Sequence, residues 1–142
     1  MTIFLAVVHA LLVIQIADTL ATSTTPPLPP LSFLSWNASP LPSPSLPPIV
    51  ICHGLLGQAK NFQSLGELLA SSHPSRGVYA LDMRNHGPYE NRWRTTMTYT
   101  EMAEDVVEWM DWCGVPTAVL IGHSMGGKVV MNLAASKGGR ER

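Results

Sequence analysis

The sequence predicts an α/β domain in which a parallel sheet is covered by helices on both faces. Three short apolar runs alternate with three segments whose apolar residues recur at helical spacing. Strands that are apolar throughout are typical of parallel sheets, because helices cover both of their faces. The regular order of strand, turn and helix therefore predicts three β-α units.

The strands and helices of these units can be placed along the chain. The expected strands are residues 49–52, 78–81 and 118–121, and the expected helices are residues 61–70, 98–113 and 124–135. Phe62, Leu65 and Leu69 share one face of the first helix, which is the face expected to be buried. A capping box at residues 98–101 begins the second helix, and Gly114 follows its end.

The segment before these units divides into two parts. Residues 1–21 include an apolar stretch, 3–17, that resembles the core of a signal peptide, although no Lys or Arg precedes Lys60. This stretch predicts export or weak membrane association, and the alternative is an N-terminal extension without a targeting role. Residues 22–47 are rich in proline and predict an extended linker, within which 31–36 could form a short edge strand.

Residues 48–136 then form the α/β domain, and residues 137–142 form a polar tail. The net charge of −1 and the 13% of charged residues give no electrostatic basis for binding nucleic acid. Cys52 and Cys113 are expected to be small buried core residues, with a disulfide or a reactive thiol as the alternatives.

The third strand leads directly into Gly122-His123-Ser124-Met125-Gly126, a G-x-S-x-G motif between strand and helix. In that position the serine lies on a sharp, strained turn and its hydroxyl projects above the sheet. The flanking glycines allow the turn to be tight. The helix that begins after Ser124 supplies free N–H groups and a positive dipole end for a developing oxyanion. The motif therefore predicts a nucleophilic serine.

The first strand ends in His53-Gly54-Leu55-Leu56-Gly57, at the same edge of the sheet. An oxyanion hole in this arrangement takes one N–H from the residue after the nucleophile and one from an earlier strand's loop. Met125 and Leu55 occupy these two positions. The alternative interpretation of the glycines in this loop is a tight turn with no chemical role.

The same residues match the patterns of two other kinds of site in part. Residues 122–128 also satisfy G-x-x-x-x-G-K, the start of a phosphate-binding loop, but Val129 stands where Ser or Thr would hold Mg²⁺. His53, His86 and His123 each follow a strand, but no carboxylate completes a ligand spacing. We therefore expect no metal site and no cofactor.

The blocks at residues 53–62, 80–87 and 119–131 together resemble the esterase and acyl-thioesterase branch of the α/β-hydrolases, typified by abhydrolase-domain-containing protein eleven. The resemblance implies that Ser124 is the nucleophile and that Leu55 and Met125 are the oxyanion donors. It also implies an ester or thioester substrate with a small acyl or lipid-like group and no cofactor. A mitochondrial location is a further implication, although the N-terminal segment lacks the arginines of a transit peptide.

In this fold the triad acid and histidine follow the nucleophile. Only 18 residues follow Ser124, so the chain is expected to be a partial hydrolase fold, truncated after the nucleophile helix. A serine without its general base is a weak nucleophile, which predicts a poor hydrolase. Two alternatives remain: a non-catalytic module that pairs through its exposed third strand, and a minimal hydrolase with an unconventional base.

Overall fold

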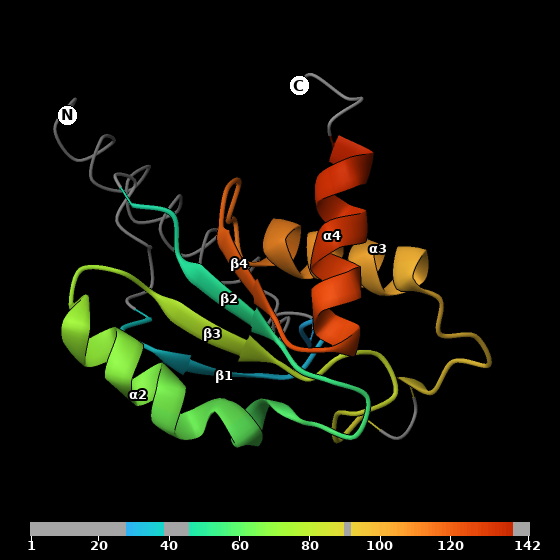
Figure 1. Ribbon diagram of the computed structural model, residues 1–142, viewed down its shortest axis with the longest axis horizontal. Coiled ribbons are helices and arrows are strands. Elements are labelled where there is room, and N and C mark those ends of the chain that lie inside the picture. The colour runs from blue at the N-terminus through green and yellow to red at the C-terminus, as the bar shows by residue number, and fades with distance from the viewer. Residues whose placement is uncertain (1–27, 39–45, 90–91, 138–142) are drawn as a thin grey trace, which may run out of the picture.

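The computed structural model describes residues 28–38, 46–89 and 92–137. Four strands form one sheet, with helices on both of its faces (Figure 1). The signal-like segment at residues 1–21 lies outside the described residues, as do its possible membrane contact and most of the polar tail. Among the helices of the described part, none is long and apolar enough to cross a membrane.

The sheet has the strand order β1-β3-β2-β4. Its strands are β1 (Phe33–Trp36), β2 (Ile49–Cys52), β3 (Val78–Leu81) and β4 (Val119–Gly122). As predicted, β2 pairs in parallel with both β3 and β4. β1 pairs antiparallel with β3, which confirms an edge strand within the proline-rich region and makes the sheet mixed.

Side chains alternate between the two faces of the sheet and divide the core into two clusters. The helical elements are a 3₁₀ turn η1 (Ala59–Phe62), α2 (Gln63–Ser72), α3 (Tyr99–Trp112) and α4 (Met125–Lys137). Val50 and Cys52 belong to the cluster with α3 and α4, whereas Ile49 and Ile51 belong to the cluster with η1 and α2. The predicted covering of both faces is confirmed.

The predicted buried face of this helical segment is confirmed at Phe62 and Leu69, which pack against the core, but not at Leu65. Leu65 is 36% exposed, whereas Gly66 and Ala70 are buried. A Cβ atom on Gly66 would lie 2.4 Å from Cζ3 of Trp36, so the helix approaches β1 closely at this glycine. Spacing within the helix could not reveal this contact, because Trp36 comes from a strand thirty residues earlier in the proline-rich region.

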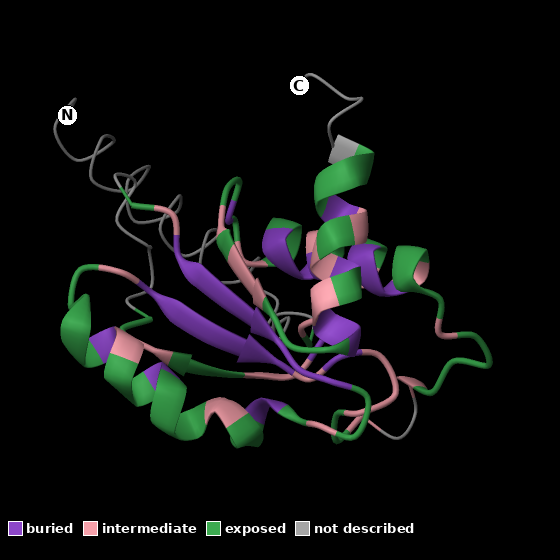
Figure 2. Cartoon of the chain, in the orientation of Figure 1, coloured by how far each residue is buried: buried purple, intermediate pink, exposed green. Residues whose placement is uncertain are grey.

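β2 and β3 are buried along their whole length, but β4 is not (Figure 2). In the described part of the chain β4 pairs only with β2, and Val119 is 42% exposed. The predicted exposed edge is therefore confirmed. An unpaired edge of this kind offers free N–H and C=O groups to another strand.

Both cysteines are free thiols. Burial raises the pKa of Cys52 to about 12 and that of the half-buried Cys113 to about 11. Both thiols therefore stay protonated near neutral pH, as core residues rather than nucleophiles.

The predicted capping box begins α3. The Thr98 hydroxyl accepts from the Glu101 N–H at 3.2 Å, and the Glu101 carboxylate accepts from the Thr98 N–H at 2.9 Å. Hydrogen bonds from Thr96 first, and then from Thr98, lower the pKa of Glu101 from 4.5 to about 2. The folded chain thus favours the ionised carboxylate.

Replacing Thr98 with alanine is expected to lower the free energy of unfolding by about 1 kcal/mol, because one end of the box is lost. Urea unfolding followed by circular dichroism measures the change, with the exposed Thr95→Ala as the control. Folding lowers the pKa of Glu101, so the contribution of its carboxylate to the free energy of unfolding is fully present above pH 4.5. That contribution is lost as the pH falls to about 2. Equal unfolding midpoints for the two variants would show that the cap contributes nothing.

Candidate active site

Ser124 lies on the sharp turn between β4 and α4. Its φ is +51°, a left-handed conformation that non-glycine residues rarely adopt, and its side chain is exposed. Strained backbone of this kind persists only where neighbouring structure enforces it, and it gathers at functional sites. The strained turn expected from the G-x-S-x-G motif is therefore present.

The glycines of the motif allow the close approach of α4 to the sheet. A Cβ atom on Gly126 would lie 2.2 Å from the carbonyl oxygen of Cys52, and one on Gly122 would lie 2.5 Å from that of Gly126. The Gly126 N–H also donates to the carbonyl oxygens of His53 at 3.1 Å and His123 at 2.9 Å. These contacts join the serine turn to the end of β2.

The loop at residues 53–57 lies directly against the serine turn. A Cβ atom on Gly54 would lie 2.8 Å from Nδ1 of His123 and 3.4 Å from Cβ of Ser124. Among the described residues, the N–H groups of Leu55 and Met125 donate to no other group. Two free backbone donors therefore lie on the two loops that meet at Ser124.

His53 is fully buried and supports this loop. Its Nε2 accepts from the Met83 N–H at 3.0 Å, so Nδ1 carries the hydrogen that is donated to the Gly54 carbonyl oxygen at 2.7 Å. Burial lowers the pKa of His53, against the opposing effect of the Gly54 hydrogen bond. Both ring nitrogens are engaged, so His53 is not free to act as a base for Ser124.

The fold thus brings every residue of the predicted site to one edge of the sheet. These residues are His53, Gly54, Leu55, Gly122, His123, Ser124, Met125 and Gly126. The register explains the proximity, since Cys52 of β2 lies opposite Gly122 of β4 and each loop begins at the next residue.

Three further anchors of the site come from the loop after β3 and are not apparent from spacing alone. Asp82 accepts from the Ala59 N–H at 2.7 Å and from the Ser32 hydroxyl at 2.8 Å. Arg84 forms a bidentate pair with Asp105 of α3, at 2.7 and 2.8 Å. His86 contacts the Leu55 carbonyl oxygen through Nε2. The sequence gives one local indication of these anchors: Asp82, Arg84 and His86 are polar residues at alternate positions directly after a buried strand.

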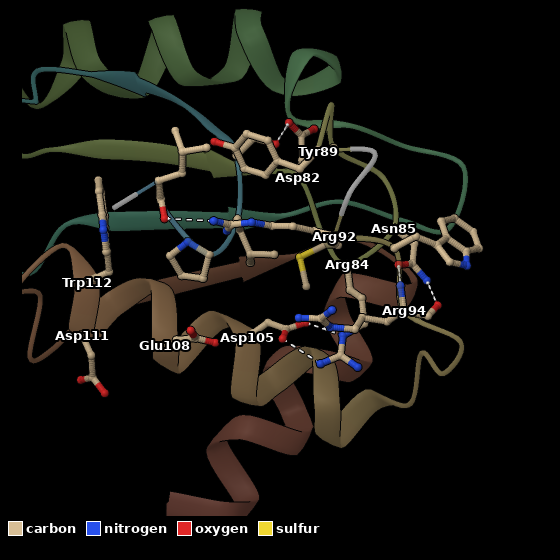
Figure 3. A pocket seen from close by; sticks show the side chains of 17 residues that line it. Asp82, Arg84, Asn85, Tyr89, Arg92, Arg94, Asp105, Glu108, Asp111 and Trp112 are labelled. Carbon is tan, nitrogen blue, oxygen red and sulfur yellow. Dashed lines mark hydrogen bonds and ion pairs between the residues drawn. The ribbon is translucent and has the colours of Figure 1, made fainter. Parts of the chain in front are cut away.

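A cavity of about 820 Å³ lies beside this loop (Figure 3). Figure 3 shows Arg84 turned toward Asp105, and Arg92 is held over the ring of Tyr89 at 5.0 Å. A second cavity, of about 880 Å³, lies between α3 and α4. Ser124 lines neither cavity, so its hydroxyl is open to solvent rather than enclosed.

The alternative kinds of site receive no support from the geometry. Within the described ranges no three His, Cys, Asp or Glu side chains are grouped so that they could hold a metal ion. Nζ of Lys128 lies 5.4 Å from the ring centre of Tyr99 on α3. The lysine of a phosphate-binding loop would instead reach the bound phosphates.

The chain is similar to known hydrolases in sequence and in structure. A sequence profile described as the alpha/beta hydrolase fold matches residues 47–141. The sn-1-specific diacylglycerol lipase ABHD11 of Xenopus tropicalis is 43% identical over 90 residues, which is 62% of this chain and 27% of that protein. Esterase YbfF of Escherichia coli K12 is 42% identical over 88 residues, covering 62% of this chain and 33% of YbfF.

Among solved structures, a marine microorganism esterase matches with a TM-score of 0.63 and 33% identity, over 76% of this chain and 37% of that one. The chain thus spans 27% of the length of the Xenopus relative and 33% of YbfF. The matched part contains the serine turn, the loop at residues 53–57 and the strands β2, β3 and β4. The chain belongs to the α/β-hydrolase fold family.

Proposed function

We propose that the chain provides the nucleophile and the oxyanion hole of a carboxylic ester hydrolase. The observation that supports this proposal best is the contact between the strained Ser124 turn and the loop at residues 53–57, with free N–H groups at Leu55 and Met125. Donors placed where negative charge develops are worth about 2.7–4 kcal/mol each to the transition state.

In the proposed reaction the Ser124 oxygen bonds to the acyl carbon and its proton passes to solvent water, since no described side chain is hydrogen-bonded to the serine to accept it. The negative charge on the former carbonyl oxygen is stabilised by the Leu55 and Met125 N–H groups. The C–O or C–S bond of the substrate then breaks, and the alcohol or thiol leaves with a proton. Water hydrolyses the acyl-enzyme, which releases the acid and restores the serine.

The substrate that we propose is an ester with a small or lipid-like acyl group. The alternative is a thioester, which would release a thiol in place of an alcohol. The names of the two curated relatives, a diacylglycerol lipase and an esterase, favour an ester. Leu55 and Leu56 are 54% and 98% exposed at the edge of the site, and they offer apolar surface to an acyl chain. The reaction needs no cofactor.

A non-catalytic interaction module is the second candidate function, and the open edge of β4 is the observation that favours it. On that hypothesis the 142-residue chain would form β-paired oligomers and Ser124 would be unreactive. Light scattering after gel filtration, combined with fluorophosphonate labelling of Ser124, distinguishes the two functions.

The purified chain is expected to form a covalent adduct with a fluorophosphonate at Ser124. The serine oxygen displaces fluoride from phosphorus, and the phosphoryl oxygen occupies the oxyanion hole. Labelling over hours, followed by intact mass and peptide mapping, measures the adduct. The matched control is Ser124→Ala, which should carry none. Equal labelling of the two proteins, or no labelling of either, would refute the proposed nucleophile.

A further inference from the structure

The leucine side chains of the loop at residues 53–57 do not hold it in place. Leu55 is half exposed and Leu56 almost completely so. A hydrogen bond of 2.8 Å from the Gly57 N–H to the Gly54 carbonyl oxygen closes the loop. Since apolar packing does not hold Leu55, the direction of its N–H depends on what binds the two peptide groups beside it.

His53 holds the peptide group between Gly54 and Leu55. The Gly54 carbonyl oxygen accepts from Nδ1 of His53 at 2.7 Å. A peptide group is planar and trans, so its N–H points opposite to its C=O. With the carbonyl directed at His53, the Leu55 N–H is directed away from it.

His86 holds the next peptide group, between Leu55 and Leu56. Nε2 of His86 contacts the Leu55 carbonyl oxygen, and its ring packs against that of His53, with 4.9 Å between centroids and 66° between planes. A carbonyl oxygen only accepts, so the hydrogen bond to Leu55 requires a hydrogen on Nε2. The peptide groups on both sides of the Leu55 Cα are therefore held by two histidines in contact with each other.

The loop that carries His86 is itself anchored. The His86 backbone N–H closes a turn onto the Met83 carbonyl oxygen at 3.0 Å. The Arg84 side chain is paired with Asp105 of α3, as Figure 3 shows. His86 thus connects the loop at residues 53–57, where Leu55 and Leu56 are exposed, to the loop after β3 that is paired with α3.

We infer that His86 is a positioning residue for the oxyanion donor at Leu55. This inference rests on the proposed hydrolase function and assigns to His86 no contact with the substrate. His53 directs the Leu55 N–H through the Gly54 carbonyl, and His86 restricts rotation about the Leu55 Cα by holding the Leu55 carbonyl on the other side. Loss of that bond leaves the serine in place but lets the donor turn away.

The test compares His86→Gln with His86→Met in the 142-residue chain. The two replacements are alike in length and flexibility, and only glutamine carries an N–H that can reach the Leu55 carbonyl. The exposed His73→Ala is the control, since Nδ1 of His73 lies 3.2 Å from a carbonyl oxygen, that of Leu69, outside the site. Two measurements are made on each variant: the kinetics of fluorophosphonate labelling at Ser124, and amide hydrogen exchange of residues 54–57.

His86→Met is expected to slow bond formation with the probe about ten- to hundredfold, less than the loss of a whole donor. The probe concentration for half-saturation should stay unchanged, and His86→Gln should recover most of the rate. Exchange at residues 54–57 should be faster in His86→Met than in His86→Gln, His73→Ala or the parent chain. If His86 had only a structural role, His86→Met would lower the thermal stability. It would not slow bond formation with the probe while leaving the probe concentration for half-saturation unchanged.

Two results overturn the inference: equal labelling rates for His86→Gln and His86→Met, or equal exchange in the two. Labelling at Ser124 with equal rates leaves the proposed nucleophile standing and removes the role of His86. Absence of labelling in the parent chain removes the proposed function. The exchange measurement then still decides whether His86 holds the Leu55 peptide group.

Discussion

The 142-residue chain is expected to hydrolyse p-nitrophenyl acetate about a millionfold more slowly than a full-length esterase relative, because among the described residues no histidine or carboxylate is hydrogen-bonded to the Ser124 hydroxyl. Residues 125–142 contain neither Asp nor His. His53 precedes the serine and has both ring nitrogens engaged. Catalysis then depends on the oxyanion donors and on substrate binding. In a serine protease that lacks its triad, these leave a rate enhancement of about 10³–10⁴ over the reaction in water.

Initial rates of the chain minus those of Ser124→Ala give the serine-dependent turnover. The full-length Escherichia coli esterase YbfF, measured in parallel, sets the upper reference. A serine-dependent rate within about a hundredfold of that reference would contradict the prediction, because it requires general-base catalysis worth about 10²–10⁴ from a group in this chain. The exposed His123 would then be the first candidate for that base, and His123→Ala would test it.

Replacing Gly126 with alanine is expected to destabilise the chain by about 3 kcal/mol or more, the upper range for an overpacked core. The new methyl group would lie 2.2 Å from the backbone oxygen of Cys52 and 2.7 Å from that of His53. Neither oxygen can rotate away as a side chain would. Relief requires α4 to shift from the sheet, which also moves the Met125 N–H relative to Ser124.

Gly127→Ala is the matched control, since its methyl group would lie 3.3 Å from the nearest atom, the carbonyl oxygen of Gly122. Alanine favours the helix by about 1 kcal/mol over glycine and the contact is only slightly tight, so this variant should lose much less stability than Gly126→Ala. Urea unfolding of both variants measures the difference, and labelling of Ser124 reports the geometry of the turn. Comparable stability of the two variants would mean that the close approach of α4 is not required.

Local patterns along the sequence determined much of the fold. β2 and β3 were predicted at their observed residues, and β4 was predicted within one residue, because each is a continuous apolar run bounded by turn residues. The capping box at residues 98–101 was also predicted, since it depends only on two side chains three residues apart. The serine turn and the loop at residues 53–57 could be expected at one edge because parallel strands end there together.

Only the tertiary structure decided how these elements meet. β1 joins the sheet antiparallel to β3, and its Trp36 turns the buried face of α2 toward Gly66 and away from Leu65. His86 reaches the Leu55 carbonyl across 31 residues of chain, and Arg84 reaches Asp105 across 21. Periodicity reports which face of an element is apolar, but not which distant residue will lie against it. The sequence by itself therefore determined the family and the candidate nucleophile, whereas the contacts that hold the oxyanion loop depend on long-range packing of three loops and α3.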